Sequence, residues 1–160
     1  MSDGLKLRKA HRDDSEFTFQ VKRAAFKDYV DQVWGWDEDS QRVLHDRRFA
    51  EQDYRVINLD GRDVGMISVA VKPDSLFVNQ LHVLPDYQGQ GIGRTCMLMV
   101  IDKGSKLDLP VRLQVLKVNP RAVAFYERLG FTITGDTDTH LQMQKMRLDQ
   151  DSPEGLSELE

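Results

Sequence analysis

The chain has 160 residues, of which 40% are hydrophobic and 30% charged, and this composition predicts one globular domain with a core of ordinary size. The formal net charge is -4, with 22 basic and 26 acidic residues interspersed along the chain, which argues against a nucleic-acid-binding protein. No apolar run is long enough to cross a membrane, and the start of the chain lacks the apolar centre of a secretory signal. We therefore expect a cytoplasmic protein with no membrane partner.

Few residues in the chain are suited to binding a metal ion. Cys96 is the single cysteine, which permits neither an internal disulfide nor a cysteine-based metal site. The four histidines are far apart in the sequence, and none forms an HxH or HxxxH pair. We therefore expect a protein without a metal.

The N-terminal third has the pattern of a strand followed by two helices. Apolar and polar residues alternate over residues 5–10, and the side chains at positions 13–15 are candidates for the N-cap of a helix. Apolar residues then recur every three or four positions, which predicts an amphipathic helix that ends near Gly35. A second, weaker helix is expected over residues 37–50.

From residue 53 the hydrophobic period changes to two, which indicates strands. Alternating stretches lie on both sides of the dipeptide Asp60-Gly61, which is typical of a tight hairpin. A second break at residues 73–75 leads into another strand pattern at 76–83. Three consecutive strands joined by short turns predict an antiparallel meander.

The second half of the chain predicts a parallel crossover. A helix over residues 91–107, apolar on most sides, leads into a β-branched strand at 111–118, and segments of this length imply a strand parallel to the third. Asn119 and Pro120 have the types preferred at the N-cap and first position of a further helix, which would close at Gly130.

A last strand pair, at residues 131–134 and 140–146, completes the predicted sheet. Together the elements predict an α/β domain of the α+β kind over residues 1–148. It would have a mixed central sheet of about seven strands, with strands 4 and 5 parallel, flanked by about four helices. The acidic tail at 149–160 has little to bury, and we expect it to be disordered.

The most specific segment is "QGQGIGR", residues 88–94, where glycines recur at every second position just before a helix. Glycine lets the backbone adopt positive φ and approach a ligand, and the first N–H groups of a helix are unpaired, so the segment suits a phosphate or pyrophosphate. A P-loop would need Gly-Lys-Ser/Thr, and a dinucleotide fingerprint would need glycine where Arg94 stands. A simple tight turn from strand to helix is the alternative.

Two motifs give the chain a resemblance to a known family. Residues 88–93 match the pattern Q/R-x-x-G-x-G/A, and "NPRAVAFYERLGF" follows at residues 119–131. Together they resemble the coenzyme A motif and the second signature of the GNAT superfamily of N-acetyltransferases. The resemblance implies the GNAT fold, acetyl-CoA as co-substrate, and transfer of an acetyl group to a primary amine by direct attack in a ternary complex.

The resemblance also implies which residues bind acetyl-CoA. Amides of the glycine segment would wrap the pyrophosphate, and the strand before it would pair with the pantetheine arm through its backbone, where an N–H would polarise the thioester carbonyl. The residue that caps the helix after the crossover would also contact the cofactor. The residues so assigned are Leu81, His82, Val83, Gln88, Gly89, Gln90, Gly91, Ile92, Gly93, Arg94, Asn119 and Tyr126.

Tyr126 is also the candidate proton donor, because a phenol of pKa about 10 suits a departing thiolate of pKa about 8.5. Packing against the neighbouring phenylalanine is the alternative. Strict alternation on the preceding strand puts Asn79 on the side that faces the acceptor and His82 on the other, so the acceptor side has no ionisable group. Asn79 could orient a water molecule, whereas His82 is expected to be a packing residue. Cys96 lies inside a helix, which disfavours an acyl-cysteine route.

In this family the acceptor site is built from the first two helices and their loop, here residues 26–39. Tyr29, Trp34 and Trp36 stand beside several carboxylates, and aromatic rings next to acidic groups suit a cationic amine. The alternative, which stays open, is that Trp34 packs in the core while the acids cap the second helix.

Two other functions remain open at this level. The missing carboxylate on the strand favours a catalytically inactive module that binds or senses acyl-CoA. A nucleotide-binding fold unrelated to the GNAT superfamily is the third interpretation. For the transferase, the acceptor would be a small-molecule or peptide amine, and a homodimer would fit the family's common behaviour.

Overall fold

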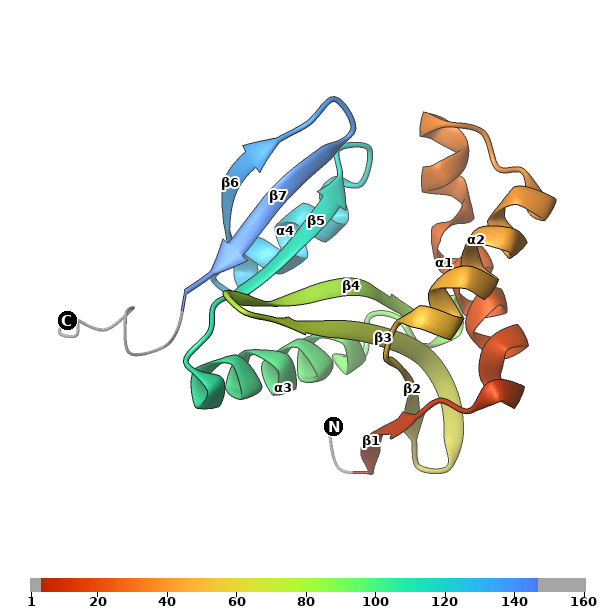
Figure 1. Cartoon of the computed structure of the whole chain (residues 1–160), viewed down its shortest axis with the longest axis horizontal. Helices are drawn as coiled ribbons and strands as arrows, with labels where there is room; N and C mark the ends of the chain where they lie inside the picture. Colours follow the sequence, from red (N-terminus) through yellow and green to blue (C-terminus); the bar gives the residue numbers. More distant parts are fainter. Residues whose placement is uncertain (1–3, 147–160) are drawn as a thin grey trace, which may run out of the picture. The chain divides into compact units, whose positions relative to one another are not determined.

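The computed structural model describes residues 4–146 of the chain (Figure 1). Contacts divide these residues into two compact units. The first contains the described residues up to Ala70 together with Asn79–Cys96, and the second contains Val71–Val78 and the described residues from Met97 onward. The predicted tail at 149–160 lies outside the described residues.

One sheet contains seven strands, hydrogen-bonded in the order β1-β2-β3-β4-β5-β7-β6. Together with the four α-helices, it confirms the predicted α/β fold class. The strands are β1 (Leu5–Lys9), β2 (Tyr54–Leu59), β3 (Arg62–Lys72), β4 (Ser75–Val83), β5 (Val111–Leu116), β6 (Thr132–Asp136) and β7 (His140–Lys145). The helices are α1 (Ser15–Val33), α2 (Glu38–Glu51), α3 (Ile92–Leu107) and α4 (Pro120–Arg128).

In the first unit, the hairpin between β2 and β3 turns where the sequence predicts it. Asp60 and Gly61 have φ of 52° and 89°, and two positive values suit the turn that matches the twist of a hairpin. β1 pairs with β2 and β2 with β3, both antiparallel. In the second pair, Tyr54 lies opposite Ser68.

An ion-pair network fixes the start of α1. Asp14 stands at the N-cap and accepts hydrogen bonds of 2.9 and 2.8 Å from the guanidinium of Arg8 on β1. The same guanidinium also donates to Asp63 on β3 at 2.9 Å. The bond from Arg8 lowers the pKa of Asp14 to about 2. One cation therefore ties two strands to the first turn of the helix.

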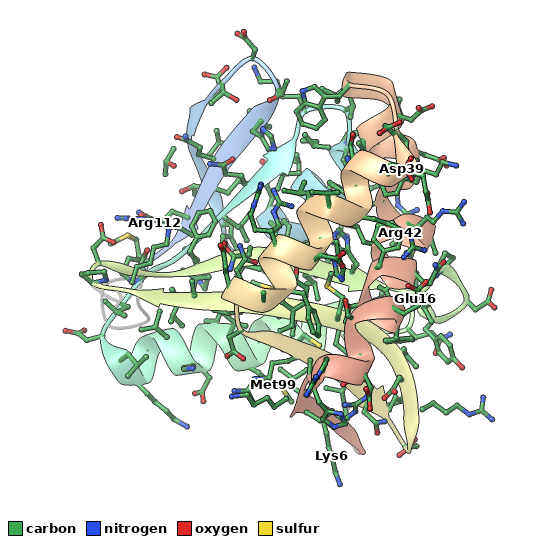
Figure 2. All side chains as sticks on the ribbon, turned by 45° about the vertical axis from the view of Figure 1, so that its right-hand side comes forward. Lys6, Glu16, Asp39, Arg42, Met99 and Arg112 are labelled. Atoms are coloured by element: carbon green, nitrogen blue, oxygen red, sulfur yellow. The ribbon has the colours of Figure 1, made fainter. Side chains whose placement is uncertain are left out.

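Helices α1 and α2 contact each other through paired charges above a layer of rings. Arg42 of α2 donates to Glu16 of α1 at 2.8 Å (Figure 2), and its guanidinium lies 4.3 Å from the centre of the Phe19 ring. Asp37 caps α2 by accepting a 2.9 Å hydrogen bond from Ser40 N. This cap confirms the predicted start of the second helix.

The core of the first unit lies between these helices and the sheet. Val21 of α1 packs with Tyr54 and Met66, and all three are buried. His45 of α2 is also buried, with its ring centre 5.5 Å from that of Phe19 and 5.7 Å from that of Tyr54. Burial lowers the pKa of His45, so its ring stays neutral.

The second unit contains the parallel pair that the sequence predicts. β4 pairs with β5 in parallel over Leu76–Val78 and Val111–Leu113, and β7 lies antiparallel between β5 and β6. The side chain of Asn119 caps α4 by accepting a backbone hydrogen bond of 3.1 Å, and Gly130, with φ of 95°, follows the helix. Both predicted ends of this helix are confirmed.

Most differences from the predicted boundaries are small, as is usual where elements end. β5 stops at Leu116, two residues before the predicted end, and α3 begins at Ile92 instead of residue 91. Within residues 4–146, no helix combines the length and the apolar character needed to span a bilayer.

Candidate functional site

The glycine segment forms the turn between β4 and α3 in the first unit. Gly89 and Gly91 have φ of 76° and 83°, a left-handed conformation that glycine tolerates best. A Cβ added at either position would meet no atom within 4 Å, so conformation and not space requires glycine here. Gly93 lies in the first turn of α3. At these two positions no side chain separates the backbone from a ligand.

Two glutamines brace this turn with their side chains. Gln88 Nε2 donates to Val83 O at 2.8 Å, and Gln90 Nε2 donates to Asp86 O at 3.2 Å. Both amide groups are thus engaged by carbonyls of the preceding segment. The backbone N–H of Gln88 is also engaged, by Pro85 O at 3.2 Å, so of these two residues only Gln90 has a free backbone donor for a ligand.

The backbone N–H groups of the turn are available to an anion. The first hydrogen bond of α3 runs from Thr95 N to Gly91 O at 3.0 Å. No acceptor within the described part of the chain pairs with the amides of residues 89–94. The dipole of the helix adds partial positive charge at the same place. These groups fit a phosphate or pyrophosphate.

The strand that leads into this turn passes close to Gly65 of β3. A Cβ at position 65 would lie 2.5 Å from His82 O and 3.1 Å from Val83 Cα. Real Cβ atoms do not approach backbone so closely, so only glycine allows β4 to run at this distance. Gly65 therefore determines how close to β3 the backbone of His82 and Val83 can lie, and this is the backbone predicted to contact the thioester of acetyl-CoA.

Side chains on β4 do not alternate strictly at the centre of the strand. Asn79 Nδ2 donates to Ser68 Oγ at 3.3 Å, and Gln80 Nε2 donates to Tyr54 Oη at 2.7 Å. Tyr54 and Ser68 are directly paired and so share one face of the sheet. Two neighbouring residues therefore point to the same face, as they do at a β-bulge.

This irregularity corrects the prediction that His82 faces away from the acceptor helices. The centre of its ring lies 4.8 Å from that of Phe26 on α1, and Phe26 in turn lies 6.1 Å from Tyr29. Burial, and after it the charge of Lys22, lowers the pKa of His82 to about 3. The ring is neutral and packed, so it is a poor proton acceptor at neutral pH.

Tyr126 lies on α4 in the second unit. Its ring makes edge contacts with Phe125 and Phe131, at centroid distances of 4.9 and 5.5 Å. Its hydroxyl has no hydrogen-bond partner among the described residues, and burial raises its pKa. The side chain is thus a packed aromatic and also a protonated group that can donate. Asn119, seven positions earlier, uses its side-chain oxygen to cap the helix.

In the segment between α1 and α2, the carboxylates serve the local structure. Trp36 N donates to Asp31 Oδ1 and Trp36 Nε1 donates to Glu38 Oε1, both at 2.9 Å. Glu38 also pairs with Arg23 at 3.1 Å. The alternative that acidic residues cap the second helix holds for Asp37, which accepts from Ser40 N. The suggestion that Trp34 packs in the core is wrong, because Trp34 is 59% exposed.

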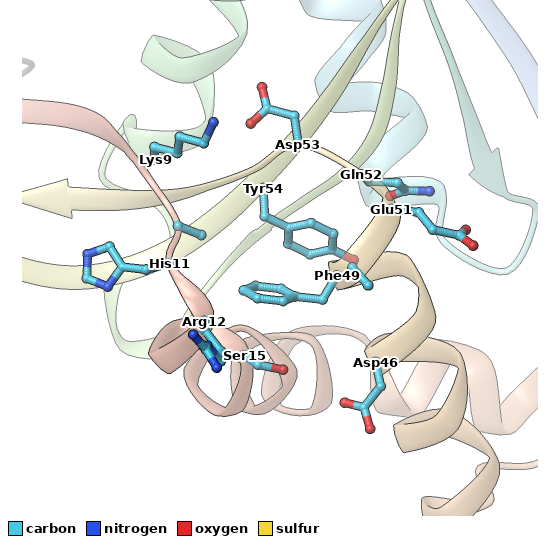
Figure 3. Close-up of a pocket in the computed structure, with 12 residues that line it drawn as sticks. Lys9, His11, Arg12, Ser15, Asp46, Phe49, Glu51, Gln52, Asp53 and Tyr54 are labelled. Carbon is cyan, nitrogen blue, oxygen red and sulfur yellow. The ribbon is translucent and has the colours of Figure 1, made fainter.

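A separate pocket of about 640 Å³ lies in the first unit, beside the rings of Phe49 and Tyr54 (Figure 3). None of the residues predicted for the site lines it. Its wall carries both basic and acidic side chains, so its charge selects no ligand class. Within residues 4–146, no group of histidine, cysteine and carboxylate side chains is placed to hold a metal ion.

A comparison with known families decides the assignment. The model described as the Acetyltransferase (GNAT) family matches residues 14–131, from the N-cap of α1 to the residue before β6. The matched range contains the glycine turn, Asn119 and Tyr126. The chain belongs to the GNAT acetyltransferase family.

GNAT relatives of established activity include enzymes that acetylate different amines. A spermidine N(1)-acetyltransferase of Escherichia coli K12 is 26% identical over 148 residues, 82% of this chain and 75% of that protein. A peptidyl-lysine N-acetyltransferase of Salmonella typhimurium is 34% identical over 65 residues, 41% of this chain and 39% of that protein. The family predicted from the two motifs is confirmed.

Solved structures show the same GNAT fold. The PaiA N-acetyltransferase of Thermoplasma acidophilum, in complex with coenzyme A, has a TM-score of 0.74 at 18% identity and covers 89% of this chain and 98% of its own. The spermidine/spermine N-acetyltransferase SpeG of Vibrio cholerae has a TM-score of 0.68 at 19% identity, with coverages of 94% and 99%. Because the sequence identities are below 20%, the structural similarity establishes the shared fold and nothing more about function.

Two residues that affect the site in the first unit were not predicted from the sequence. Gly65 carries the usual signal of close backbone approach, a lone glycine inside a strand pattern. Lys22 stands four residues before Phe26, on the face of α1 that turns inward.

Proposed function

We propose that this GNAT protein transfers an acetyl group from acetyl-CoA to a primary amine, which attacks directly in a ternary complex. One observation carries the proposal: residues 89–94 present unpaired backbone amides and two glycines of positive φ at the start of α3, inside a matched GNAT domain. Bound acetyl-CoA would supply the activated acetyl group.

Backbone groups of the first unit account for binding of this co-substrate. Amides of residues 89–94, including those of Ile92, Gly93 and Arg94, bind the pyrophosphate, whereas the amide of Gln88 is already paired with Pro85 O. The backbone of Leu81, His82 and Val83 pairs with the pantetheine arm and directs an N–H at the thioester carbonyl. Such a donor contributes about 3 kcal/mol to the transition state of acyl transfer. The side chain of Asn119 caps α4, and we assign it a further contact with the cofactor.

Two side chains manage protons in this proposal. Tyr126 donates a proton to the departing thiolate, which its raised pKa and unpaired hydroxyl support. Asn79, whose amide reaches Ser68 at 3.3 Å, orients a water molecule that takes the proton of the amine. Cys96 is fully buried, and burial raises its pKa to about 12, so a covalent acyl-cysteine is disfavoured.

The acceptor amine is assigned to the side of the first unit formed by α1 and α2. Tyr29 extends the row of rings made by His82 and Phe26, and Trp36 lies 6.2 Å from Phe19, measured between ring centres. Tyr29, Trp34 and Trp36 are the proposed contacts of a small-molecule or peptide amine.

A second function is binding of acyl-CoA without transfer. It is favoured by β4, which carries no carboxylate, and by the low pKa of His82. Both functions require the glycine turn, so binding of acetyl-CoA does not separate them. Release of coenzyme A in the presence of an amine does.

The deciding experiment measures free thiol released from acetyl-CoA by the purified protein across a panel of amines. Transfer predicts amine-dependent release, and mass spectrometry of the acceptor should show the added acetyl group. Tight binding of acetyl-CoA by calorimetry with no release from any amine would leave the binding module as the function. Failure to bind acetyl-CoA would overturn both.

A further inference from the structure

β4 leaves its neighbour β5 halfway along its length. The ladder between the two strands ends at Val78, although β4 continues to Val83. The division into two compact units falls at the same place, because residues 79–96 belong to the first unit. This second half of β4, residues 79–83, contains the backbone that we assign to the thioester. Its position therefore depends on contacts within the first unit.

Two side-chain hydrogen bonds anchor this half of β4 to β2 and β3. Gln80 Nε2 donates to Tyr54 Oη at 2.7 Å, which is short for a bond of this type. Asn79 Nδ2 donates to Ser68 Oγ at 3.3 Å, which is long for one. Tyr54 is 3% exposed, so little water competes for its hydroxyl. Tyr54 is therefore the stronger of the two anchors.

The ring of Tyr54 is held on several sides, so its hydroxyl is a fixed point. The ring of Phe49 lies beside it, with 5.1 Å between the two centres (Figure 3). The centre of the His45 ring lies at 5.7 Å. Val21 of α1 and Met66 of β3 belong to the same buried cluster. None of these contacts needs the hydroxyl, so phenylalanine at position 54 would keep them.

The side-chain amide of Gln80 depends on this one partner. Its Oε1 is buried and has no donor among the described residues. Without the Tyr54 hydroxyl, neither polar end of this partly buried amide would have a partner in the described chain, which is unfavourable. The amide would then turn toward water and draw β4 with it. The hydrogen bond to Tyr54 thus holds the strand in place.

The anchored residues also set the direction of the peptide groups that follow them. Asn79 and Gln80 share one face of the sheet, so the alternation of the strand is interrupted there. Loss of this bulge would shift the alternation by one residue. The N–H that we direct at the thioester carbonyl would then point elsewhere. A misplacement of about 1 Å at a reacting group can lower a rate by roughly a hundredfold.

We infer that Tyr54 and Gln80 are positioning residues for acetyl transfer: their hydrogen bond holds the bulge of β4 and so directs the N–H of the following backbone at the thioester carbonyl. The inference rests on the proposed function. It adds two residues that act through the backbone of β4 and not by contact with acetyl-CoA or the amine. The weaker bond between Asn79 and Ser68 supports the same bulge.

A double-mutant cycle tests the inference by thiol release. Tyr54→Phe removes the hydroxyl and Gln80→Met removes the amide, and each should lower kcat about tenfold, with smaller changes in KM for the amine and Kd for acetyl-CoA. Because both variants break the same bond, the double variant should have the kcat of a single one. Its free energy of unfolding should recover toward that of the wild type, since neither group is left without its partner. Stability should thus recover where kcat does not.

Gln20→Met is the matched control for Gln80→Met. Gln20 Nε2 on α1 donates to Glu16 Oε2 at 2.7 Å, so the substitution and the length of the lost bond are the same, and kcat should stay unchanged. A double variant that regains the wild-type kcat would overturn the inference, because kcat would then merely follow stability. If Tyr54→Phe does not fold, Gln80→Met decides, and an unchanged kcat in that variant would also overturn it.

Amide hydrogen exchange separates this inference from the proposed function, because it needs no substrate. In the purified protein, the protected N–H groups of residues 81–84 should exchange about tenfold faster in Tyr54→Phe than in the wild type, while those of β1 change much less. If no amine releases thiol but this pattern holds, acetyl transfer fails and the role of Tyr54 in positioning β4 stands. An equal change in both strands, or no change in either, would overturn the inference whatever the rate of transfer.

Discussion

Gly65 on β3 faces the main chain of His82 on β4 so closely that a Cβ at position 65 would lie 2.5 Å from His82 O. The position of β4, the strand that we propose contacts the thioester of acetyl-CoA, thus depends on the absence of a side chain at position 65. Gly65→Ala should push β4 away, lower the free energy of unfolding by about 1–3 kcal/mol, and weaken acetyl-CoA binding.

Gly35→Ala is the matched control for this variant. Gly35 has φ of 82°, but nothing lies within 4 Å of an added Cβ, so alanine there is strained without displacing a strand. Urea unfolding and calorimetry should show lower stability in both variants and weaker acetyl-CoA binding in Gly65→Ala alone. Equal affinity in the two variants would mean that the His82 backbone does not contact the cofactor.

Gly91→Asp tests the pyrophosphate assignment. A carboxylate at this exposed turn would oppose the phosphates at short range, at a cost of about 3 kcal/mol, or roughly a hundredfold in dissociation constant. Gly61→Asp is the control, because Gly61 has φ of 89° and equally open surroundings in the hairpin between β2 and β3, outside the glycine turn. Calorimetry that finds unchanged acetyl-CoA affinity in Gly91→Asp would remove the assignment.

Tyr126→Phe should lower kcat by roughly a hundredfold while leaving acetyl-CoA affinity nearly intact. Phenylalanine keeps the edge contacts to Phe125 and Phe131 and loses only the hydroxyl. Phe131→Leu, which disturbs packing but keeps the hydroxyl, separates chemistry from structure. An undiminished rate in Tyr126→Phe would assign the proton to another donor.

Trp36→Ala should raise KM for the amine about tenfold, with a smaller change in acetyl-CoA affinity. Trp36→Phe removes only the indole N–H that donates to Glu38 and keeps a ring beside Phe19, so it should retain most of the affinity. A larger effect on acetyl-CoA than on the amine would move the acceptor site elsewhere.

Lys22→Met should stabilise the protein near neutral pH. Burial lowers the pKa of Lys22 from 10.5 to about 8, so the folded state binds its proton less tightly than the unfolded state. The resulting penalty is about 3 kcal/mol below pH 8, and it disappears as the pH rises from 8 toward 10.5. Urea unfolding should show the largest gain over the wild type at pH 7 and almost none above pH 10. A gain that does not vary with pH would contradict this explanation.

The sequence predicts those features whose cause is local. Asp60-Gly61 specifies a hairpin, Asn119 caps a helix and Gly130 ends it, because each of these residues acts through its own backbone or its near neighbours. The parallel order of β4 and β5 also follows from the length of the crossover. The family follows from two motifs with fixed spacing.

Features that depend on distant partners escape such reasoning. Asn79 and Gln80 share a face because of Ser68 and Tyr54 on neighbouring strands, so alternation alone gives the wrong side for His82. The sequence likewise leaves open whether Trp34 packs in the core or faces an acceptor, and only the structure shows that it is exposed at the end of α1.

Cys96, the single thiol of the chain, is sealed inside α3 with 0% exposure and a pKa raised to about 12 by burial. In an activity assay with native protein, a thiol-reactive dye should consequently react only with the coenzyme A that turnover releases. The thiol of the protein itself should add no background signal. After the substrate is exhausted, the dye should react slowly with Cys96 in the same sample. The rate of this reaction measures how often the interior of the protein opens transiently.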